Sequence, residues 1–463
     1  MEREKLGSRL GFILISAGCA IGIGNVWKFP YVAGQNGGGF FVLLYLLFLV
    51  IMGIPVLSME FSMGRSAQKS PVKMYQALAP DKKAFKAHGY AALAGNILLM
   101  MFYTSVSGWM VQYFIYMISG KFTNIPQENQ SEYVSSVFSN MLSNPGMLIL
   151  FIGIVVAVGF IVCSFNMQKG LEKVTKVMML ALLVLIIVLA IHSLTLDGAG
   201  EGLKFYLLPS ASKIKEAGGI LPVIVAAMNQ AFFTLSLGIG AMAIFGSFIG
   251  KERTLLGEGV NVAVLDTFVA ITSGLIIFPA CFTYGVEVDA GPNLIFVTLP
   301  HVFMNMPLGT LWGSLFFLFM TFAAMSTIFA VFQNIISCIQ EITLWSKAKT
   351  CIICGISLFI LSIPCALGFN LLAGFTPLGQ GTGVLDLEDY IVSNILLPIG
   401  SLVIVIFCTQ KFGWGFENYM QEANCGKGLK VKNWMKFYMT YILPIIIGAI
   451  AVISIISPFV DFI

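Results

Sequence analysis

The sequence predicts an all-α protein that crosses a membrane many times, and three observations lead to this fold class. Of the 463 residues, 58% are hydrophobic and 10% are charged, whereas soluble domains carry about 25% charged residues. Apolar runs of about 20 residues, the length of a membrane-spanning helix, recur along the whole chain. Two of these runs, one in each half, are interrupted by a Gly-Ile-Gly sequence. A soluble globular protein is excluded, because so apolar a chain would expose too much hydrophobic surface.

Eleven apolar segments are long enough to cross a bilayer, and they form one transmembrane domain over residues 1–463. We number them spans 1 to 11 in chain order. Their expected bounds are 9–33, 39–64, 89–119, 146–164, 174–195, 221–249, 260–285, 308–341, 351–368, 388–410 and 435–458.

The basic residues between these spans predict the orientation of the chain. Loops on one side hold 21 of the 26 Lys and Arg residues, and loops on the other side hold only Lys121, Lys204, Lys213 and Lys215. Because positively charged loops stay in the cytoplasm, we expect a protein of the cytoplasmic membrane with a cytoplasmic N-terminus. An odd number of spans then places the C-terminus outside. Basic residues this dispersed do not predict nucleic-acid binding.

Span 1 contains glycines at positions 18, 22 and 24, followed by Asn25. Glycine destabilises a helix by roughly 1 kcal/mol relative to alanine, so the backbone is expected to unwind here. Free carbonyls would then face a cation, and the amides that open the next half-helix would face an anion. The alternative is that Gly18 and Gly22 form a small-residue motif for helix packing.

Span 6 repeats this design, with Gln230, Thr234 and Ser236 next to its own glycines. Interrupted helices at matching places in two halves of a membrane protein indicate a solute site between them. The sequence therefore predicts a transporter.

Two further spans carry polar groups that suit a cation. Asp266 lies deep in span 7, where a charge costs at least about 2.5–3.5 kcal/mol, so it needs a proton, a cation or a buried salt-bridge partner. Ser326 and Thr327 place adjacent hydroxyls in span 8, where oxygen ligands suit a hard cation. The alternative is that these hydroxyls bond to their own helix.

Residues 286–307, between spans 7 and 8, combine three prolines with apolar residues. Two structures fit this pattern equally: a re-entrant hairpin that plugs an outer vestibule, or a pair of surface helices. His88 and His192 lie near expected span ends and are interpreted as interfacial residues.

Several of these motifs resemble the neurotransmitter:sodium symporter family, whose bacterial members have the LeuT fold. The resemblance runs from Arg3 to about Gln410. Its motifs are Gly18-Cys-Ala-Ile-Gly-Ile-Gly-Asn25, Phe29-Pro30, Asn36-Gly-Gly-Gly39, Gln230-Ala-Phe-Phe-Thr-Leu-Ser-Leu-Gly-Ile-Gly240, Tyr103 and Trp109.

The resemblance implies two inverted five-helix repeats, residues 9–195 and 221–410, followed by span 11 at 435–458. It also implies two sodium sites. The first would use the carbonyls of Ala20 and Thr234 and the side chains of Asn25, Thr234 and Asp266. The second would use the carbonyls of Gly18, Ile21 and Ala323 and the hydroxyls of Ser326 and Thr327.

The resemblance places an amino acid between the two broken helices. Its carboxylate would meet the first sodium, the amides of Ile23 and Gly24, and the Tyr103 hydroxyl. Its ammonium group would meet the carbonyls of Ala20, Phe233 and Thr234 and the Ser236 hydroxyl. Phe233 would close the pocket, whose walls would be Leu99, Ile239, Ile328 and Val331.

Four departures from the family pattern are informative. Monoamine transporters have an aspartate where this chain has Gly22, so a substrate with its own carboxylate is expected. Asp266 replaces the usual asparagine near the chloride position of Tyr45, Gln230 and Thr234, which predicts chloride-independent transport. Lys28 replaces the arginine of the outer gate, where it would pair with Asp389 or Asp386. Arg3 and Glu341 match the inner-gate pair, while Leu6 and Phe248 replace its usual Trp and Tyr.

These features together predict a sodium-coupled amino acid symporter in which spans 1, 2, 6 and 7 rock against the rest. The apolar pocket walls favour a hydrophobic or aromatic substrate. The span count and Asp266 are similar to bacterial tyrosine transporters of this family. An ion channel and a non-transporting amino acid sensor of the same fold are the alternatives. An enzyme is not expected, because no nucleophile and base occur at a catalytic spacing.

Overall fold

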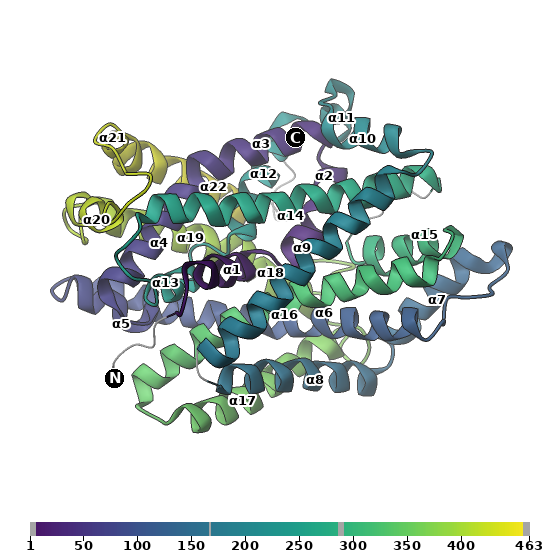
Figure 1. Ribbon diagram of the computed structural model, residues 1–463, viewed down its shortest axis with the longest axis horizontal. Coiled ribbons are helices and arrows are strands. Elements are labelled where there is room, and N and C mark those ends of the chain that lie inside the picture. The colour runs from purple at the N-terminus through teal and green to yellow at the C-terminus, as the bar shows by residue number, and fades with distance from the viewer. Residues whose placement is uncertain (1–5, 166–167, 286–290, 457–463) are drawn as a thin grey trace.

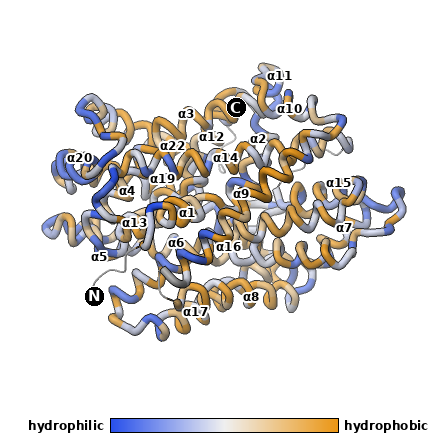
Figure 2. Tube along the Cα trace, viewed as in Figure 1, coloured by the Kyte–Doolittle hydropathy of each residue, from blue (hydrophilic) through white to orange (hydrophobic). Residues whose placement is uncertain are grey.

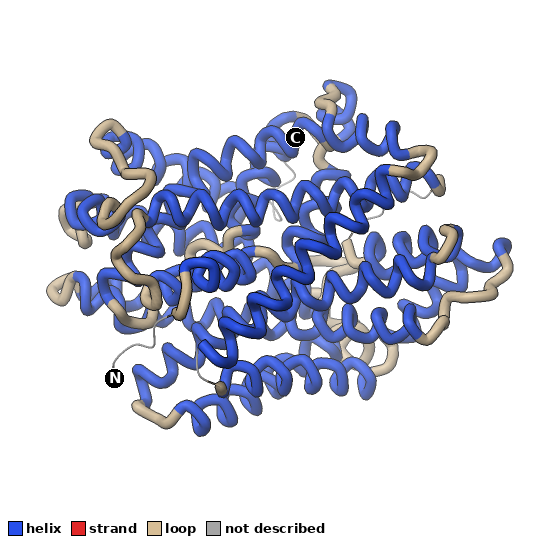
Figure 3. Tube along the Cα trace, in the orientation of Figure 1, coloured by secondary structure: helices blue, strands red, loops and turns tan. Residues whose placement is uncertain are grey.

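The structure is a computed structural model that describes residues 6–165, 168–285 and 291–456. Helices account for its regular structure, and the described residues form no strand (Figure 3). Most helices run roughly along the long axis of the molecule (Figure 1). Hydrophobic residues cover the middle of the bundle and hydrophilic residues gather at its two ends (Figure 2). This distribution matches a protein that crosses a bilayer, and it confirms the predicted fold class.

Nine stretches of the described chain are continuous helices that are long and apolar enough to cross a membrane. They are span 2 with α3 (Gly39–Phe48), η2 (Leu49–Gly53) and α4 (Ile54–Ala67); span 3 with η3 (Lys83–Phe85) and α6 (Lys86–Ile118); span 4 with α8 (Pro145–Ser164); span 5 with η5 (Gln168–Glu172) and α9 (Lys173–Leu194); span 7 with α14 (Leu255–Thr283); span 8 with α16 (Gly309–Thr343); span 9 with α17 (Lys347–Leu367); span 10 with α18 (Val384–Tyr390), η7 (Ile391–Leu396) and α19 (Leu397–Thr409); and span 11 with α21 (Met435–Phe437), η8 (Tyr438–Ile442) and α22 (Leu443–Ile456).

Spans 1 and 6 are broken at their glycines. In span 1, α1 (Arg9–Ala20) is bent by 55° from the helix formed by η1 (Gly24–Lys28) and α2 (Phe29–Gln35). In span 6, α12 (Ile220–Thr234) and α13 (Ala241–Gly246) are separated by residues 235–240. The breaks therefore lie where the Gly-Ile-Gly sequences predict them.

Short helices connect the spans and gather at the two ends of the bundle. Figure 1 shows α5 (Pro71–Leu78) and α20 (Phe416–Ala423) at the end that holds the N-terminus. The opposite end holds η4 (Gln127–Asn129), α7 (Gln130–Leu142), α10 (Ala199–Leu207), α11 (Ala211–Glu216), η6 (Leu294–Thr298) and α15 (Leu299–Asn305).

The segment between spans 7 and 8 fits neither alternative fully. Residues 286–290 lie outside the described residues. Residues 294–305 form one helical stretch, in which Leu294, Phe296 and Val302 are fully buried. The indole of Trp27 donates a hydrogen bond of 2.9 Å to the Gly291 carbonyl. This segment therefore packs into the bundle beside span 1 instead of lying on its surface.

Proline explains five of the six π-helical segments of the described chain. Segments η1, η2, η6, η7 and η8 are each followed by a helix with proline as its second residue: Pro30, Pro55, Pro300, Pro398 and Pro444. Proline has no amide hydrogen, and its ring clashes with the carbonyl four residues earlier. A wider i→i+5 turn relieves this clash and leaves carbonyls without an intrahelical partner.

Two of these released carbonyls accept hydrogen bonds from other spans. The Tyr438 hydroxyl of span 11 donates to the Ile51 carbonyl in η2 at 2.5 Å. The Gln410 side chain, at the end of span 10, donates to the Thr440 carbonyl in η8 at 2.9 Å. In a bilayer, where water does not reach such groups, these bonds attach span 11 to its neighbours.

Candidate solute and ion site

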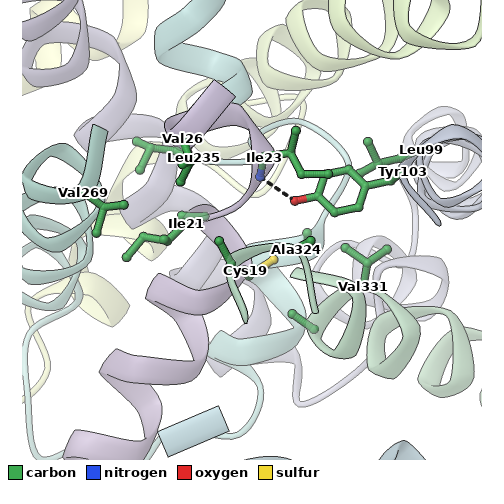
Figure 4. Packing of buried hydrophobic residues seen from close by; sticks show 14 of the residues in the cluster. Cys19, Ile21, Ile23, Val26, Leu99, Tyr103, Leu235, Val269, Ala324 and Val331 are labelled. Carbon is green, nitrogen blue, oxygen red and sulfur yellow. Dashed lines mark hydrogen bonds between the residues drawn. The ribbon is translucent and has the colours of Figure 1, made fainter. Parts of the chain in front are cut away.

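The break in span 1 turns its backbone groups toward other spans. The amide of Ile21 still bonds to the Ala17 carbonyl at 2.6 Å, but the next two amides leave the helix. The Gly22 amide donates to Asn25 Oδ1 at 3.2 Å, and the Ile23 amide donates to Tyr103 Oη at 2.9 Å (Figure 4). The last carbonyls of α1 are therefore free to meet partners from span 8.

Those carbonyls meet the two hydroxyls that the sequence singles out in α16. Thr327 Oγ1 lies 3.2 Å from the Gly18 carbonyl oxygen and 3.3 Å from that of Ile21. Ser326 Oγ lies 3.3 Å from the Ile21 carbonyl and 2.9 Å from the Ala323 carbonyl. The structure thus brings together all five groups assigned to the second sodium site. Carbonyl and hydroxyl oxygens at the negative end of a helix are suitable ligands for a hard cation.

Asp266 is the centre of the other cluster. It is fully buried in α14, and its carboxylate accepts hydrogen bonds from Asn25 Nδ2 at 2.7 Å, Thr234 Oγ1 at 2.8 Å and Tyr45 Oη at 3.4 Å. The structure shows no ion pair to Asp266 from any described residue. A buried carboxylate in a membrane requires a proton or a cation.

The orientation of Asn25 differs from the prediction. Its amide nitrogen, not its oxygen, faces Thr234 and Asp266, while Oδ1 accepts from the Gly22 amide. A cation bound among these groups needs the amide to turn so that its oxygen faces the carboxylate. The described residues contain no group of three or more His, Cys, Asp or Glu side chains that could hold a metal. The two oxygen-rich clusters, around Thr327 and around Asp266, are the candidate cation sites.

A small cavity of about 20 Å³ lies between the two broken spans. Gly24, Tyr103 and Phe233 line both this cavity and a larger vestibule of about 490 Å³, so these three residues lie between the two. Ile23 lines the vestibule but does not line the smaller cavity. The residues around the smaller cavity are Cys19, Ala20, Gly22, Gly24, Leu99, Tyr103, Phe233, Ser236, Ile239, Thr327, Val392 and Leu397.

Two expected wall residues, Ile328 and Val331, are not among those that line this cavity. Ile328 is turned toward α8, where its Cγ2 lies 3.1 Å from the position of a Cβ on Gly159. Span 10 supplies two wall residues that the sequence analysis missed, Val392 and Leu397. An apolar residue in an apolar span gives no signal that would identify it as part of a pocket.

Gly22 and Gly24 are required by close approach. A Cβ on Gly22 would lie 2.2 Å from Tyr103 Oη and 2.5 Å from Thr327 Oγ1. A Cβ on Gly24 would lie 2.6 Å from Cε1 of Phe233. Only glycine lets the backbone of span 1 come this close to both the hydroxyls and the aromatic ring.

Lys28 lies in the vestibule directly above Phe233. Its Nζ is 3.9 Å from the centroid of the Phe233 ring and 3.0 Å from Asp389 Oδ2. Ser393 accepts a further hydrogen bond from Lys28 at 3.2 Å. Asp386, the alternative partner, instead accepts from the Gly383 amide of its own helix at 2.7 Å. The gate residues proposed from the sequence are therefore in contact at the vestibule.

The pair expected at the opposite end is described only in part, because Arg3 lies outside the described residues. Glu341 accepts hydrogen bonds from the Ser70 amide and, at 2.7 Å, from the Ser70 hydroxyl. The Leu6 amide donates to the Phe248 carbonyl at 3.4 Å. A salt bridge of 2.9 Å joins Arg9 to the buried Glu258. The contacts of Leu6 and Arg9 hold the N-terminal segment against this end of the bundle.

Comparisons with known proteins agree with this arrangement. The model of the sodium:neurotransmitter symporter family matches residues 3–135 and 123–460. An uncharacterized sodium-dependent transporter of Bacillus subtilis, YhdH, is 34% identical over 95% of each chain. The taurine transporter of Bos taurus, described as sodium- and chloride-dependent, is 26% identical over 98% of this chain and 78% of its own. The crystal structure of MhsT in complex with L-phenylalanine shares 36% identity, with a TM-score of 0.87 over 98% of this chain and 100% of MhsT.

The fold and the two broken spans define a membrane transporter with the LeuT fold. The chain belongs to the sodium:neurotransmitter symporter family, and it is a sodium-dependent transporter.

Proposed function

We propose that this protein takes up a hydrophobic or aromatic amino acid together with two sodium ions and without chloride. The observation that carries this proposal is the approach of the Tyr103 hydroxyl to the Ile23 amide, 2.9 Å apart beside Gly22. This places an amide and a hydroxyl at the opening of a half-helix, whose positive end favours an anion. A substrate carboxylate is the group that suits this position.

The apolar lining of the cavity supports the choice of side chain. Leu99, Ile239, Val392 and Leu397 offer no polar side-chain group to a substrate, so a polar or charged side chain would be buried there without a partner. MhsT was crystallised with L-phenylalanine, which supports an aromatic substrate for this related chain. The carbonyls and the hydroxyl around Ala20, Phe233, Thr234 and Ser236 would accept from the ammonium group.

Sodium coupling follows from two clusters that flank the same break. One sodium would bind among Gly18, Ile21, Ala323, Ser326 and Thr327, and the other among Ala20, Asn25, Thr234 and Asp266. Each ion holds α1 in its bent position and thereby shapes the cavity. One charge that moves down 100 mV supplies about 2.3 kcal/mol, so two sodium ions are sufficient for strong accumulation.

The arrangement of charged residues supports a cytoplasmic N-terminus in the cytoplasmic membrane. The loops around α5 and α20, which are rich in basic residues, lie at the end that holds the N-terminus (Figure 1), and the vestibule is lined by Phe138 and Leu142 of α7, which lies at the other end. In transport, spans 1, 2, 6 and 7 would rock so that this vestibule closes as the N-terminal end opens. Eleven spans place the C-terminus outside.

Uptake of radiolabelled amino acids into proteoliposomes tests the proposal. Competition by each of the twenty amino acids identifies the substrate, with leucine, tryptophan, tyrosine and phenylalanine expected to compete best. Replacement of sodium by potassium should abolish uptake, and replacement of chloride by gluconate should leave it unchanged. Sodium-dependent binding without uptake would instead favour an amino acid sensor, and single-channel currents would favour an ion channel.

A further inference from the structure

One residue in the break of span 6, Gly238, is contacted by side chains from two other spans. The amide of Gly238 donates to Oε1 of Glu60, in α4, at 2.6 Å. The imidazole of His88, in α6, lies beside the carbonyl of Gly238. His88 therefore contacts the segment that carries Ser236 and follows Phe233 and Thr234.

The packing around Gly238 identifies the imidazole nitrogen that faces this carbonyl. A Cβ on Gly400, in span 10, would lie 2.1 Å from the Gly238 carbonyl oxygen and 2.9 Å from His88 Nε2. Glycine at position 400 thus leaves the space in which this oxygen and Nε2 meet.

Tyr75 determines which imidazole nitrogen of neutral His88 carries the hydrogen. Its Oη lies 2.6 Å from His88 Nδ1, and its ring meets the imidazole edge-on, with centroids 5.5 Å apart. A carbonyl can only accept, so the contact with Gly238 is favourable only when Nε2 carries the hydrogen. In neutral histidine Nδ1 is then an acceptor, and the Tyr75 hydroxyl donates a hydrogen bond to it. Tyr75 therefore selects the tautomer that can bind the carbonyl.

We propose that His88 and Tyr75 are positioning residues for sodium and solute binding. Ser236 has a φ of +51°, a left-handed conformation that non-glycine residues rarely adopt. Such a turn persists only where its surroundings hold it. Two side chains from α6 do so at successive carbonyls: His88 lies beside the Gly238 carbonyl, and Asn96 Nδ2 donates to the Ile239 carbonyl at 2.8 Å. The same helix binds span 1 through Tyr103, so α6 aligns both breaks.

Four substitutions, one of them also made in combination, separate a positioning role of His88 and Tyr75 from simple packing. In His88→Gln the side chain keeps an N–H donor and has no tautomers, whereas in His88→Leu the donor is lost. Tyr75→Phe is made in the wild type and in His88→Gln. Tyr90→Phe is the matched control, because Tyr90 is an exposed tyrosine of α6, the helix that carries His88. The readout is binding of radioactive sodium to the purified protein, which does not depend on the identity of the solute.

The half-saturating sodium concentration should rise about tenfold in His88→Leu, because the Gly238 carbonyl is left without its partner. In His88→Gln it should stay within about twofold of the wild-type value. Tyr75→Phe should raise it about threefold in the wild type and not at all in His88→Gln. An equal effect of Tyr75→Phe in both backgrounds, or normal binding in His88→Leu, would overturn the proposal. If His88→Leu does not purify as a folded protein, the comparison of Tyr75→Phe in the two backgrounds decides.

Proteoliposome uptake of L-phenylalanine adds a second readout. Because the break shapes the binding site and not the large-scale motion, the half-saturating concentration should rise in Tyr75→Phe while the maximal rate stays near wild type. A fall in the maximal rate alone would contradict a positioning role. Absence of L-phenylalanine uptake by the wild type would count against the proposed substrate, and the sodium measurement would still test His88.

Discussion

The side-chain amide of Asn25 lies 2.7 Å from the carboxylate of Asp266, although the two residues are 241 positions apart in the chain. This contact joins the break in span 1 to the middle of span 7. The carboxyl group of Asp266 also accepts hydrogen bonds from Thr234 and Tyr45, which the family resemblance assigns to the surroundings of chloride. A carboxylate in this position can supply the negative charge that a bound chloride supplies elsewhere.

Replacement of Asp266 by asparagine should therefore make transport depend on chloride. The amide is nearly the same size and can still accept from Thr234, but it carries no charge. We expect the wild type to transport equally in chloride and gluconate, and Asp266→Asn to transport only in chloride. Asp81→Asn, in an exposed loop, should behave as the wild type. Equal uptake by Asp266→Asn in both buffers would refute the charge argument.

Removal of one hydroxyl from the second ion cluster should weaken sodium binding. In Thr327→Ala the cluster loses an oxygen that lies within 3.3 Å of two carbonyls. A hydrogen-bonding partner of a charged group contributes about 1.5 kcal/mol or more, so the half-saturating sodium concentration should rise at least roughly tenfold. Thr321→Ala is the control, because this hydroxyl of the same helix bonds only to the Phe317 carbonyl in the structure. Unchanged sodium dependence of uptake in Thr327→Ala would remove this cluster from the ion path.

Asn25→Ala should likewise raise the sodium requirement, because it removes the side chain that bridges Thr234 and Asp266. The measurement is sodium-dependent uptake at fixed substrate, with surface expression followed in parallel. If both Asn25→Ala and Thr327→Ala keep normal sodium affinity, the assignment of the two ion sites is wrong.

A methyl group at position 22 should abolish transport. The Cβ of Gly22→Ala would lie 2.2 Å from Tyr103 Oη, so either the tyrosine or the backbone of the break must move. Gly200→Ala, in α10 with no atom within 4 Å of its Cβ, is the matched control and should retain activity and thermal stability. Normal uptake by Gly22→Ala would show that the approach of Tyr103 to this backbone is not required.

The Lys28–Asp389 pair should act as a loose gate. Both side chains are partly exposed, at 27% and 31%, and such pairs contribute only about 0–1 kcal/mol. We expect Lys28→Gln to speed solute release from the purified protein by up to about fivefold without preventing uptake. Lys28→Arg, which can bind the carboxylate in a bidentate manner, should slow release. Complete loss of binding in Lys28→Gln would mean that this lysine has a direct role in the site.

The sequence carries enough information to locate the two breaks and the pair of hydroxyls that meets the end of α1. Glycines interrupt apolar runs there, and the paired hydroxyls of Ser326 and Thr327 are conspicuous in span 8. Their proximity needed the structure, because the Gly18 carbonyl and Thr327 are 309 positions apart.

Other features could not be predicted because they depend on how helices rotate against one another. Ile328 and Val392 are both apolar residues in apolar spans, yet only Val392 lines the cavity. His88 is near the end of span 3, and its inward contact depends on the space left by Gly400 in span 10. The orientation of the Asn25 side-chain amide depends on whether its oxygen accepts from the Gly22 amide, as it does in the structure, or faces Asp266.

The π-helical turns ahead of the prolines have a consequence for the assembly of the bundle. The Ile51 and Thr440 carbonyls, released by Pro55 and Pro444, bond to Tyr438 and Gln410. Each proline therefore affects a second helix as well as its own. It widens a turn of its own helix, and the carbonyl freed by that turn accepts a hydrogen bond from a neighbouring helix. Restoring a regular helix with alanine at position 55 would remove an anchor for span 11, and the last span would dock less firmly although none of its own residues had changed.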